Sequence, residues 1–160
     1  MRWLLPLLIG LAAAPAAARE ALGTFGGWAA FRDLTPRRCY AIGQPEPAKG
    51  QAPTGGSLAI AFWPAAGAAG QLHARLGPAA PRGGTAMLAI GARRFPLRRQ
   101  GRDLWAADAA ADAAIAPALR SGETIAILVR DGRAHYTDLY PPRGLATAID
   151  AAALACAAQR

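Results

Sequence analysis

The sequence predicts a mainly β protein, an antiparallel β-sandwich or barrel-like sheet with one short internal helix and one C-terminal helix. Many short apolar segments alternate with a period of two residues, which is typical of strands in a sheet. Stretches containing Gly and Pro separate these segments at short intervals, as turns do. Two other segments instead carry the end signals and the three-to-four-residue spacing of helices.

The first half of the chain contains strands that end at Pro or Gly. We expect them over residues 29–33, 37–43, 57–63 and 71–76. In the third of these, Leu58, Ile60 and Phe62 share one face and Ala or Trp side chains share the other. That pattern predicts a strand covered at least partly on both faces. Residues 44–56 hold three Pro and three Gly without periodicity, and we interpret them, and residues 67–70, as loops.

The second half combines short hairpins with the two helices. Strands are expected over residues 85–90, 93–99, 103–106, 123–130 and 134–140, and Asp131-Gly132 is a strong hairpin signal between the last two. Residues 108–121 predict a helix, although Pro117 argues against a straight one. The last helix is expected over residues 144–156. There Leu145, Ile149, Ala152 and Cys156 recur at spacings of four, three and four residues, which predicts one core-facing stripe.

Residues 1–18 have the three parts of a signal peptide. Arg2 is followed by an apolar run over residues 3–14 and then by small residues, so we place the cleavage site after Ala18. The apolar run is shorter than the ~20 residues that span a bilayer, and no other segment is long and apolar enough. We therefore predict a periplasmic or secreted protein, with outer-membrane association as an option. Residues 19–160 would form one β-rich domain without a transmembrane span. A buried N-terminal helix is the alternative interpretation of residues 1–18.

The two cysteines of the chain, Cys39 and Cys156, predict a disulfide. An even number of cysteines in an oxidising compartment usually pairs. Cys39 lies on an expected strand, and Cys156 ends the core-facing stripe of the last helix. The bridge would close most of the domain. Two unrelated buried thiols are the alternative.

The chain is strongly basic, with a formal net charge of +8. Five arginines crowd one expected hairpin: Arg93, Arg94, Arg98, Arg99 and Arg102. They form a candidate anion-binding patch, because guanidinium groups bind phosphate and carboxylate in a bidentate manner. Charge on an exposed hairpin also prevents edge-to-edge pairing, and a coding bias that replaces Lys by Arg is the stronger explanation of the basic composition. Nucleic acid is not expected as a partner in the periplasm.

The sequence carries few groups that do chemistry, so we predict no enzyme activity and no cofactor or metal site. Zinc-binding, nucleotide-binding and serine-hydrolase motifs are missing, and only two His and two Ser occur. His135 is expected as a half-exposed strand residue, and the tryptophans of the domain are expected in the core. The alternative is a hydrolase in which two carboxylates act as acid and base; the candidates are Asp33, Asp103, Asp131 and Asp138.

The order of several short motifs resembles the invasion-associated locus B family of exported proteins from Gram-negative bacteria. The similar segments are Phe25–Trp28, Arg38–Ala41, Ile90-Gly91, Phe95–Leu97, Trp105-Ala106, Ala118–Gly122, Asp138–Tyr140, Gly144-Leu145, Ile149 and Cys156. The chain departs from the family at Pro141-Pro142 and at Leu145, where a Ser-Leu pair and an aromatic residue are usual. The resemblance implies a β-rich fold at the cell envelope and provides no catalytic residues.

These observations together favour an exported accessory or interaction protein of the envelope that lacks evident catalysis. The expected partner is an anionic envelope surface or another envelope protein. The carboxylate hydrolase stays open as the alternative.

Overall fold

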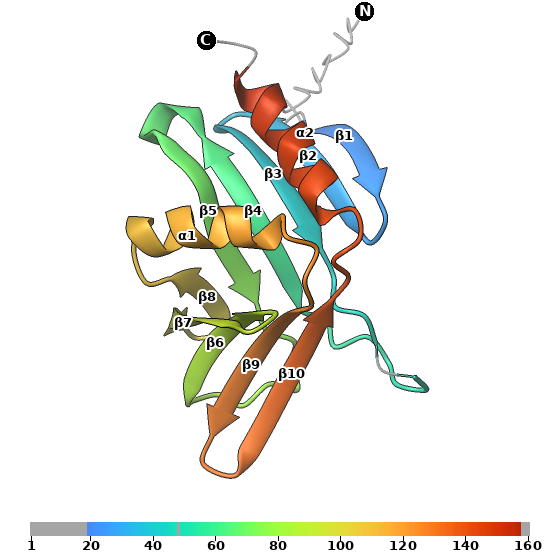
Figure 1. Cartoon of the computed structure of the whole chain (residues 1–160), viewed down its shortest axis with the longest axis vertical. Helices are drawn as coiled ribbons and strands as arrows, with labels where there is room; N and C mark the ends of the chain where they lie inside the picture. The colour runs from blue at the N-terminus through green and yellow to red at the C-terminus, as the bar shows by residue number, and fades with distance from the viewer. Residues whose placement is uncertain (1–18, 48, 158–160) are drawn as a thin grey trace, which may run out of the picture.

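The computed structural model describes residues 19–47 and 49–157, which form ten strands and two α-helices (Figure 1). The strands are β1 (Arg19–Phe25), β2 (Trp28–Leu34), β3 (Arg37–Gly43), β4 (Ser57–Trp63), β5 (Ala68–Arg75), β6 (Thr85–Ile90), β7 (Arg93–Gln100), β8 (Asp103–Ala106), β9 (Ile125–Asp131) and β10 (Ala134–Tyr140). The helices are α1 (Ala109–Leu119) and α2 (Leu145–Ala157), with a short 3₁₀ helix η1 (Pro64–Ala66). The predicted fold class, mainly antiparallel β with an internal and a C-terminal helix, is confirmed.

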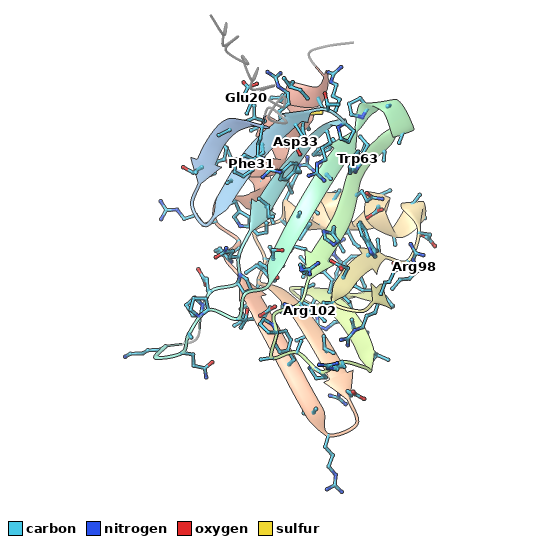
Figure 2. The ribbon with its side chains drawn as sticks, turned by 180° about the vertical axis from the view of Figure 1, so that it is seen from behind. Glu20, Phe31, Asp33, Trp63, Arg98 and Arg102 are labelled. Atoms are coloured by element: carbon cyan, nitrogen blue, oxygen red, sulfur yellow. A yellow bond between two sulfur atoms is a disulfide. The ribbon has the colours of Figure 1, made fainter. Side chains whose placement is uncertain are left out.

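All the described strands belong to one antiparallel sheet, in the order β1-β2-β3-β4-β5-β8-β7-β6-β9-β10. The helices α1 and α2 lie on the same side of it (Figure 1). Helix α2 packs across β1 to β4, and α1 packs against β5 and β8. Figure 2 shows the other side, over which no helix of the described residues passes. We call this side the open face.

The core lies between the sheet and its helices because the strands alternate. Leu58 and Ile60 of β4 and Leu72 of β5 are fully buried on the helix side. The predicted stripe of α2 is confirmed, since Leu145, Ile149, Ala152 and Cys156 are all buried. Side chains between these positions point to the open face, and the site described below is built from them.

The sheet curls so that strands near its two ends approach each other. The ring of Trp28 on β2 lies 6.1 Å from the ring of Tyr140 on β10, centroid to centroid. The Trp28 indole also donates a hydrogen bond of 2.7 Å to the carbonyl of Pro141. Gly43 leaves room for this ring, because a side chain there would collide with it. The Trp28 side chain therefore joins β2 to β10 and to the chain segment that follows β10.

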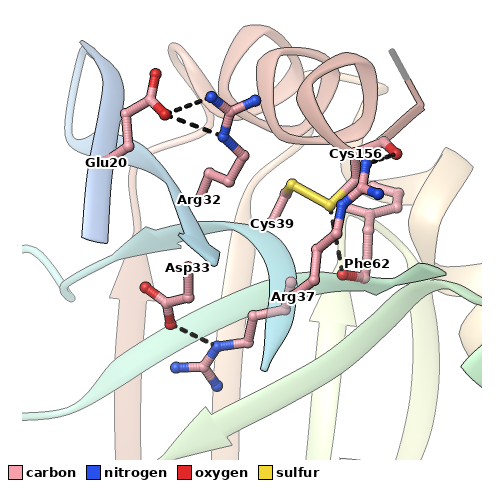
Figure 3. Close-up of a disulfide and its surroundings, with 8 residues drawn as sticks. Glu20, Arg32, Asp33, Arg37, Cys39, Phe62 and Cys156 are labelled. Carbon is pink, nitrogen blue, oxygen red and sulfur yellow. Dashed lines mark hydrogen bonds and ion pairs between the residues drawn. A yellow bond between two sulfur atoms is a disulfide. The ribbon is translucent and has the colours of Figure 1, made fainter. Parts of the chain in front are cut away.

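The predicted disulfide is confirmed. Cys39 on β3 and Cys156 on α2 are bonded, with a Cα–Cα distance of 5.8 Å that is usual for a disulfide. Arg37 donates a hydrogen bond of 3.1 Å to the carbonyl of Cys156, and the Cys156 sulfur lies 3.9 Å from the carbonyl of Phe62 (Figure 3). The bridge therefore ties the last helix to β3, the third strand from the β1 end of the sheet.

Three local features differ from expectation. β1 is an additional strand; Gly23 interrupts its alternation, and its pairing with β2 shifts register between Ala21 and Gly23. Residues 67–70 do not form a loop, because η1 and Gly67 make the turn and β5 begins at Ala68. Pro117 lies inside α1, where it cannot donate the helical hydrogen bond to the carbonyl four residues before it, and the helix ends two residues later at Leu119.

The predicted signal peptide, residues 1–18, lies outside the described residues. Within the described ranges, no helix is long and apolar enough to cross a membrane.

Candidate functional site

The open face carries arginines and aromatic rings instead of the small polar side chains of an ordinary solvated sheet. Strand alternation explains this, because Cys39 faces α2 and its neighbours Arg38 and Tyr40 therefore face the other way. Figure 2 shows Phe31, Asp33 and Trp63 on this side of the sheet. Two clusters stand out on it, one over β1 to β4 and one over β5, β8 and β7.

The first cluster is a ladder of stacked rings and guanidinium groups. The rings of Phe31 and Tyr40 lie 5.6 Å apart. The Arg38 guanidinium lies 4.8 Å from the Tyr40 ring and 5.3 Å from the Trp63 ring, within the range of cation–π attraction. Arg19 lies over Phe31 and Tyr40 at 5.8 and 5.7 Å. Charged side chains therefore cover the rings, and Tyr40 is only 7% exposed.

Asp33 fixes this ladder from the middle. Its two carboxylate oxygens accept hydrogen bonds of 2.9 Å from Arg19 and 2.8 Å from Arg38. Partial burial favours the neutral acid, but the hydrogen bonds and charges of these two arginines outweigh it and lower the pKa of Asp33. Both guanidinium groups are thus already paired with a carboxylate, so neither is free for an external anion.

The second cluster surrounds Trp105 on β8. The ring of His73, its cross-strand partner on β5, stacks on the indole with centroids 4.2 Å apart. Asp103 accepts a hydrogen bond of 2.9 Å from the His73 ring and is paired with Arg75 at 3.1 Å. Arg98 faces Trp105 from the opposite side, on β7. One indole therefore lies between a fixed imidazole and an arginine.

The five arginines predicted as an anion-binding patch have different surroundings. Arg99 donates to the carbonyls of Pro81, Gly83 and Gly101, and Arg102 donates twice to the carbonyl of Leu76. Those two side chains hold the loop between β5 and β6 in place. Arg94 donates to the carbonyls of Gly91 and Arg93, and the Arg93 guanidinium lies 5.6 Å from the Phe95 ring.

Arg98 is the member of the predicted patch that lies beside Trp105. It donates one hydrogen bond of 3.3 Å, from Nε to the carbonyl of Ala106. Together with Arg99, Gln100 and Trp105 it lines an open hollow on the sheet. Strand alternation puts Arg98 and Gln100 on the same side of β7, next to the outward indole of β8.

The four carboxylates of the predicted hydrolase alternative have separate partners. Asp33 belongs to the ladder and Asp103 to the Trp105 cluster. Asp131 lies at the end of β9 beside Gly83, and Asp138 is buried. The structure thus distributes these carboxylates over four surroundings. Among the described residues, no group of three or more His, Cys, Asp and Glu side chains is arranged to hold a metal ion.

Asp138 is 1% exposed and anchors a loop to β10. It accepts a hydrogen bond of 2.8 Å from the Tyr136 hydroxyl and is also hydrogen-bonded to Thr54, and the same hydroxyl accepts one of 3.1 Å from the backbone N–H of Gly77. Burial raises the pKa of Asp138, and the hydrogen bonds from Thr54 and Tyr136 offset only part of that effect. The network joins residues 54–56, residue 77 and β10, which is a structural role.

Asp138 and Asp33 are expected to make the stability depend on pH in opposite directions. The folded protein binds the Asp138 proton more tightly than the unfolded chain, so the contribution of Asp138 falls as pH rises above about 4, the unfolded pKa. The pKa of Asp33 is lowered in the folded protein, so the contribution of Asp33 to stability rises with pH in the range below about 4. Melting temperatures of Asp138→Asn and Asp33→Asn between pH 2.5 and 7 test this. Parallel curves for wild type and Asp138→Asn would contradict the assignment.

Comparison with protein-family models, curated proteins and solved structures gives no match for this chain.

Only some of the residues in the two clusters could be predicted from the sequence. Trp28 is a core residue as expected, whereas Trp63 and Trp105 are partly exposed on the open face, so the expectation of core positions is wrong for them. His73 carried no sequence signal. The alternation of Asp103 and Trp105 with buried Leu104 was such a signal, since it places both on the side opposite the core.

Proposed function

We propose that the protein is an exported, non-enzymatic interaction protein of the bacterial envelope and that it binds its partner through the open face. The observation that carries the proposal is the arrangement of the sheet. Helices α1 and α2 cover one side, while the other side carries arginines and the partly exposed rings of Phe31, Trp63 and Trp105. Exposed surfaces that combine aromatic side chains with Arg are typical of binding sites.

The sequence supports a location of the protein in the bacterial envelope. Residues 1–18 have the pattern of a signal peptide, and the order of motifs resembles the invasion-associated locus B family. The Cys39–Cys156 disulfide fits an oxidising compartment. The separate surroundings of Asp33, Asp103, Asp131 and Asp138 favour an interaction protein over a carboxylate hydrolase.

The proposal predicts salt-sensitive binding to an anionic envelope surface. We expect the protein, recovered from the periplasm with an N-terminus near Arg19, to sediment with vesicles that contain lipopolysaccharide. Retention should be strong at 0.01 M salt and weak at 0.15 M, because the Debye length falls from ~30 Å to ~8 Å. Arg94→Glu/Arg98→Glu should abolish retention, since both side chains are exposed and neither donates to the β5–β6 loop as Arg99 and Arg102 do.

A matched control separates the open face from net charge. Arg133→Glu/Arg143→Glu makes the same change in charge on exposed arginines of the β9–β10 turn and of the segment before α2, outside the strands, and it should retain most of the binding. An equal loss of vesicle retention in both double variants would show that overall charge, and not the open face, determines binding. No retention of the wild type at low salt, or a protein confined to the cytoplasm, would refute the proposed function.

A further inference from the structure

We propose that the hollow beside Trp105 is a sugar-binding site, specific for a pyranose ring that carries a phosphate or carboxylate group. This inference rests on the proposed function and names the ligand class of the open face. It depends on three side chains, Trp105, Arg98 and Gln100, which line the same hollow.

Trp105 supplies a flat apolar platform whose orientation is fixed. His73 stacks on the indole from the β5 side, and Asp103 holds the imidazole with a hydrogen bond of 2.9 Å. Arg75 in turn pairs with Asp103 at 3.1 Å. The hollow opens toward β7, on the side of the indole away from His73. Pyranose rings expose C–H groups on one face, and a rigid aromatic ring buries such a face with little loss of side-chain entropy.

Arg98 supplies the charge for the anionic group. Its Nε donates to Ala106, which leaves the Nη groups of the guanidinium for a ligand. Among the described residues, no carboxylate lies within salt-bridge distance of Arg98, whereas Asp103 pairs with Arg75 and Asp33 pairs with Arg19 and Arg38. The Asp112 carboxylate on α1 interacts electrostatically with Arg98 but forms no salt bridge with it. The Nη groups of the guanidinium therefore suit a phosphate or carboxylate oxygen pair of a ligand.

Gln100 completes the set with a group that both donates and accepts. It lies two residues from Arg98 on the same side of β7, where its amide can reach ring hydroxyls. Hydroxyl groups need donors and acceptors together, so an amide beside an aromatic ring and a cation is a polar arrangement suited to a charged sugar.

A peptide or a phospholipid fits this place less well. β8 is paired on both sides, to β5 and β7, so the hollow offers no free strand edge for a peptide backbone. The exposed large hydrophobic residues of the described chain are Leu34, Leu139 and Leu154, and none of them lines the hollow. An acyl chain would therefore find the Trp105 ring beside Arg98 but no exposed aliphatic side chain to pack against.

The test compares soluble glycans with a lipid surface. The full chain is titrated with two soluble glycans: phosphorylated core oligosaccharide from deacylated lipopolysaccharide, and tetragalacturonate. Binding is measured by calorimetry and by tryptophan fluorescence. The first probe carries the anion as phosphate and the second as carboxylate, so the two arms distinguish the source. Dephosphorylated core oligosaccharide and phosphatidylglycerol vesicles serve as comparisons.

We expect binding of at least one anionic glycan, weakened about tenfold or more by Trp105→Ala and by Arg98→Gln. Trp105→Phe should keep affinity within about threefold, because it keeps a ring on the platform. Arg133→Gln, an exposed arginine away from the hollow, should bind as the wild type does. Melting temperatures confirm that each variant is folded.

Two results would overturn the inference. One is glycan affinity that Trp105→Ala leaves unchanged in a folded protein. The other is retention on phosphatidylglycerol vesicles without binding of either glycan, which would mean that the open face responds to charge alone. Both results leave the proposed envelope function standing, whereas failure to associate with any anionic surface removes the proposed function itself.

Discussion

Replacement of the disulfide in a Cys39→Ala/Cys156→Ala variant is expected to lower the free energy of unfolding by about 5 kcal/mol. The two cysteines are separated by 117 residues, so the bridge closes a loop that spans most of the described chain. In the chain-entropy model a long loop restricts the unfolded state strongly, which stabilises the folded state. A loss of that size is a large part of the total stability of a typical domain.

Urea unfolding of the oxidised protein, the reduced protein and the double variant measures this effect. The reduced wild type should resemble the variant, because both lose the loop closure. The steepness of the transition with urea should also rise without the bridge, since a less restricted unfolded chain exposes more surface. A difference below about 1 kcal/mol between oxidised and reduced protein would show that the long loop contributes little.

The strands were predictable where the local pattern agreed with the final environment. β3, β4 and β10 begin and end at the expected residues, because their alternation is uninterrupted and turn residues bound them. β1 was not predictable in the same way, since Gly23 breaks its alternation and its edge position leaves it held by β2 alone within the sheet. The strand order was not predicted from the sequence either, because pairing of β5 with β8 depends on contacts far apart in the chain.

In the candidate site, too, features set by local sequence were predictable, whereas features set by strand pairing were not. The arginines of the predicted patch are adjacent in sequence, yet the structure separates them: Arg99 and Arg102 bind loop carbonyls, and Arg98 lines the hollow. Proximity in sequence did not indicate which guanidinium groups carry backbone hydrogen bonds. The pairing of His73 with Trp105 required the β5–β8 register, and no local pattern encodes that register.

Trp28 is expected to be the most important single side chain for the curl of the sheet. Trp28→Ala should lower the free energy of unfolding by about 3–5 kcal/mol, the usual range for removing a large buried aromatic residue. The side chain is 1% exposed, lies over Gly43 and packs against Tyr140. Its loss leaves a cavity that Gly43 cannot fill. It also leaves the Pro141 carbonyl without the indole donor.

Two comparison variants divide this effect into its parts. Trp28→Phe keeps most of the packing and loses the 2.7 Å hydrogen bond, so it should cost about 1–3 kcal/mol. Trp63→Ala removes the same side chain from a partly exposed position on the open face, and it should cost about 1–2 kcal/mol. Urea unfolding followed by far-UV circular dichroism gives all three values. Equal losses for Trp28→Ala and Trp63→Ala would mean that the joining of β2 to β10 does not depend on the buried indole. In that case the backbone segment after β10, which brings Gly144 against the carbonyl of Phe25, would have to hold the two ends of the sheet together.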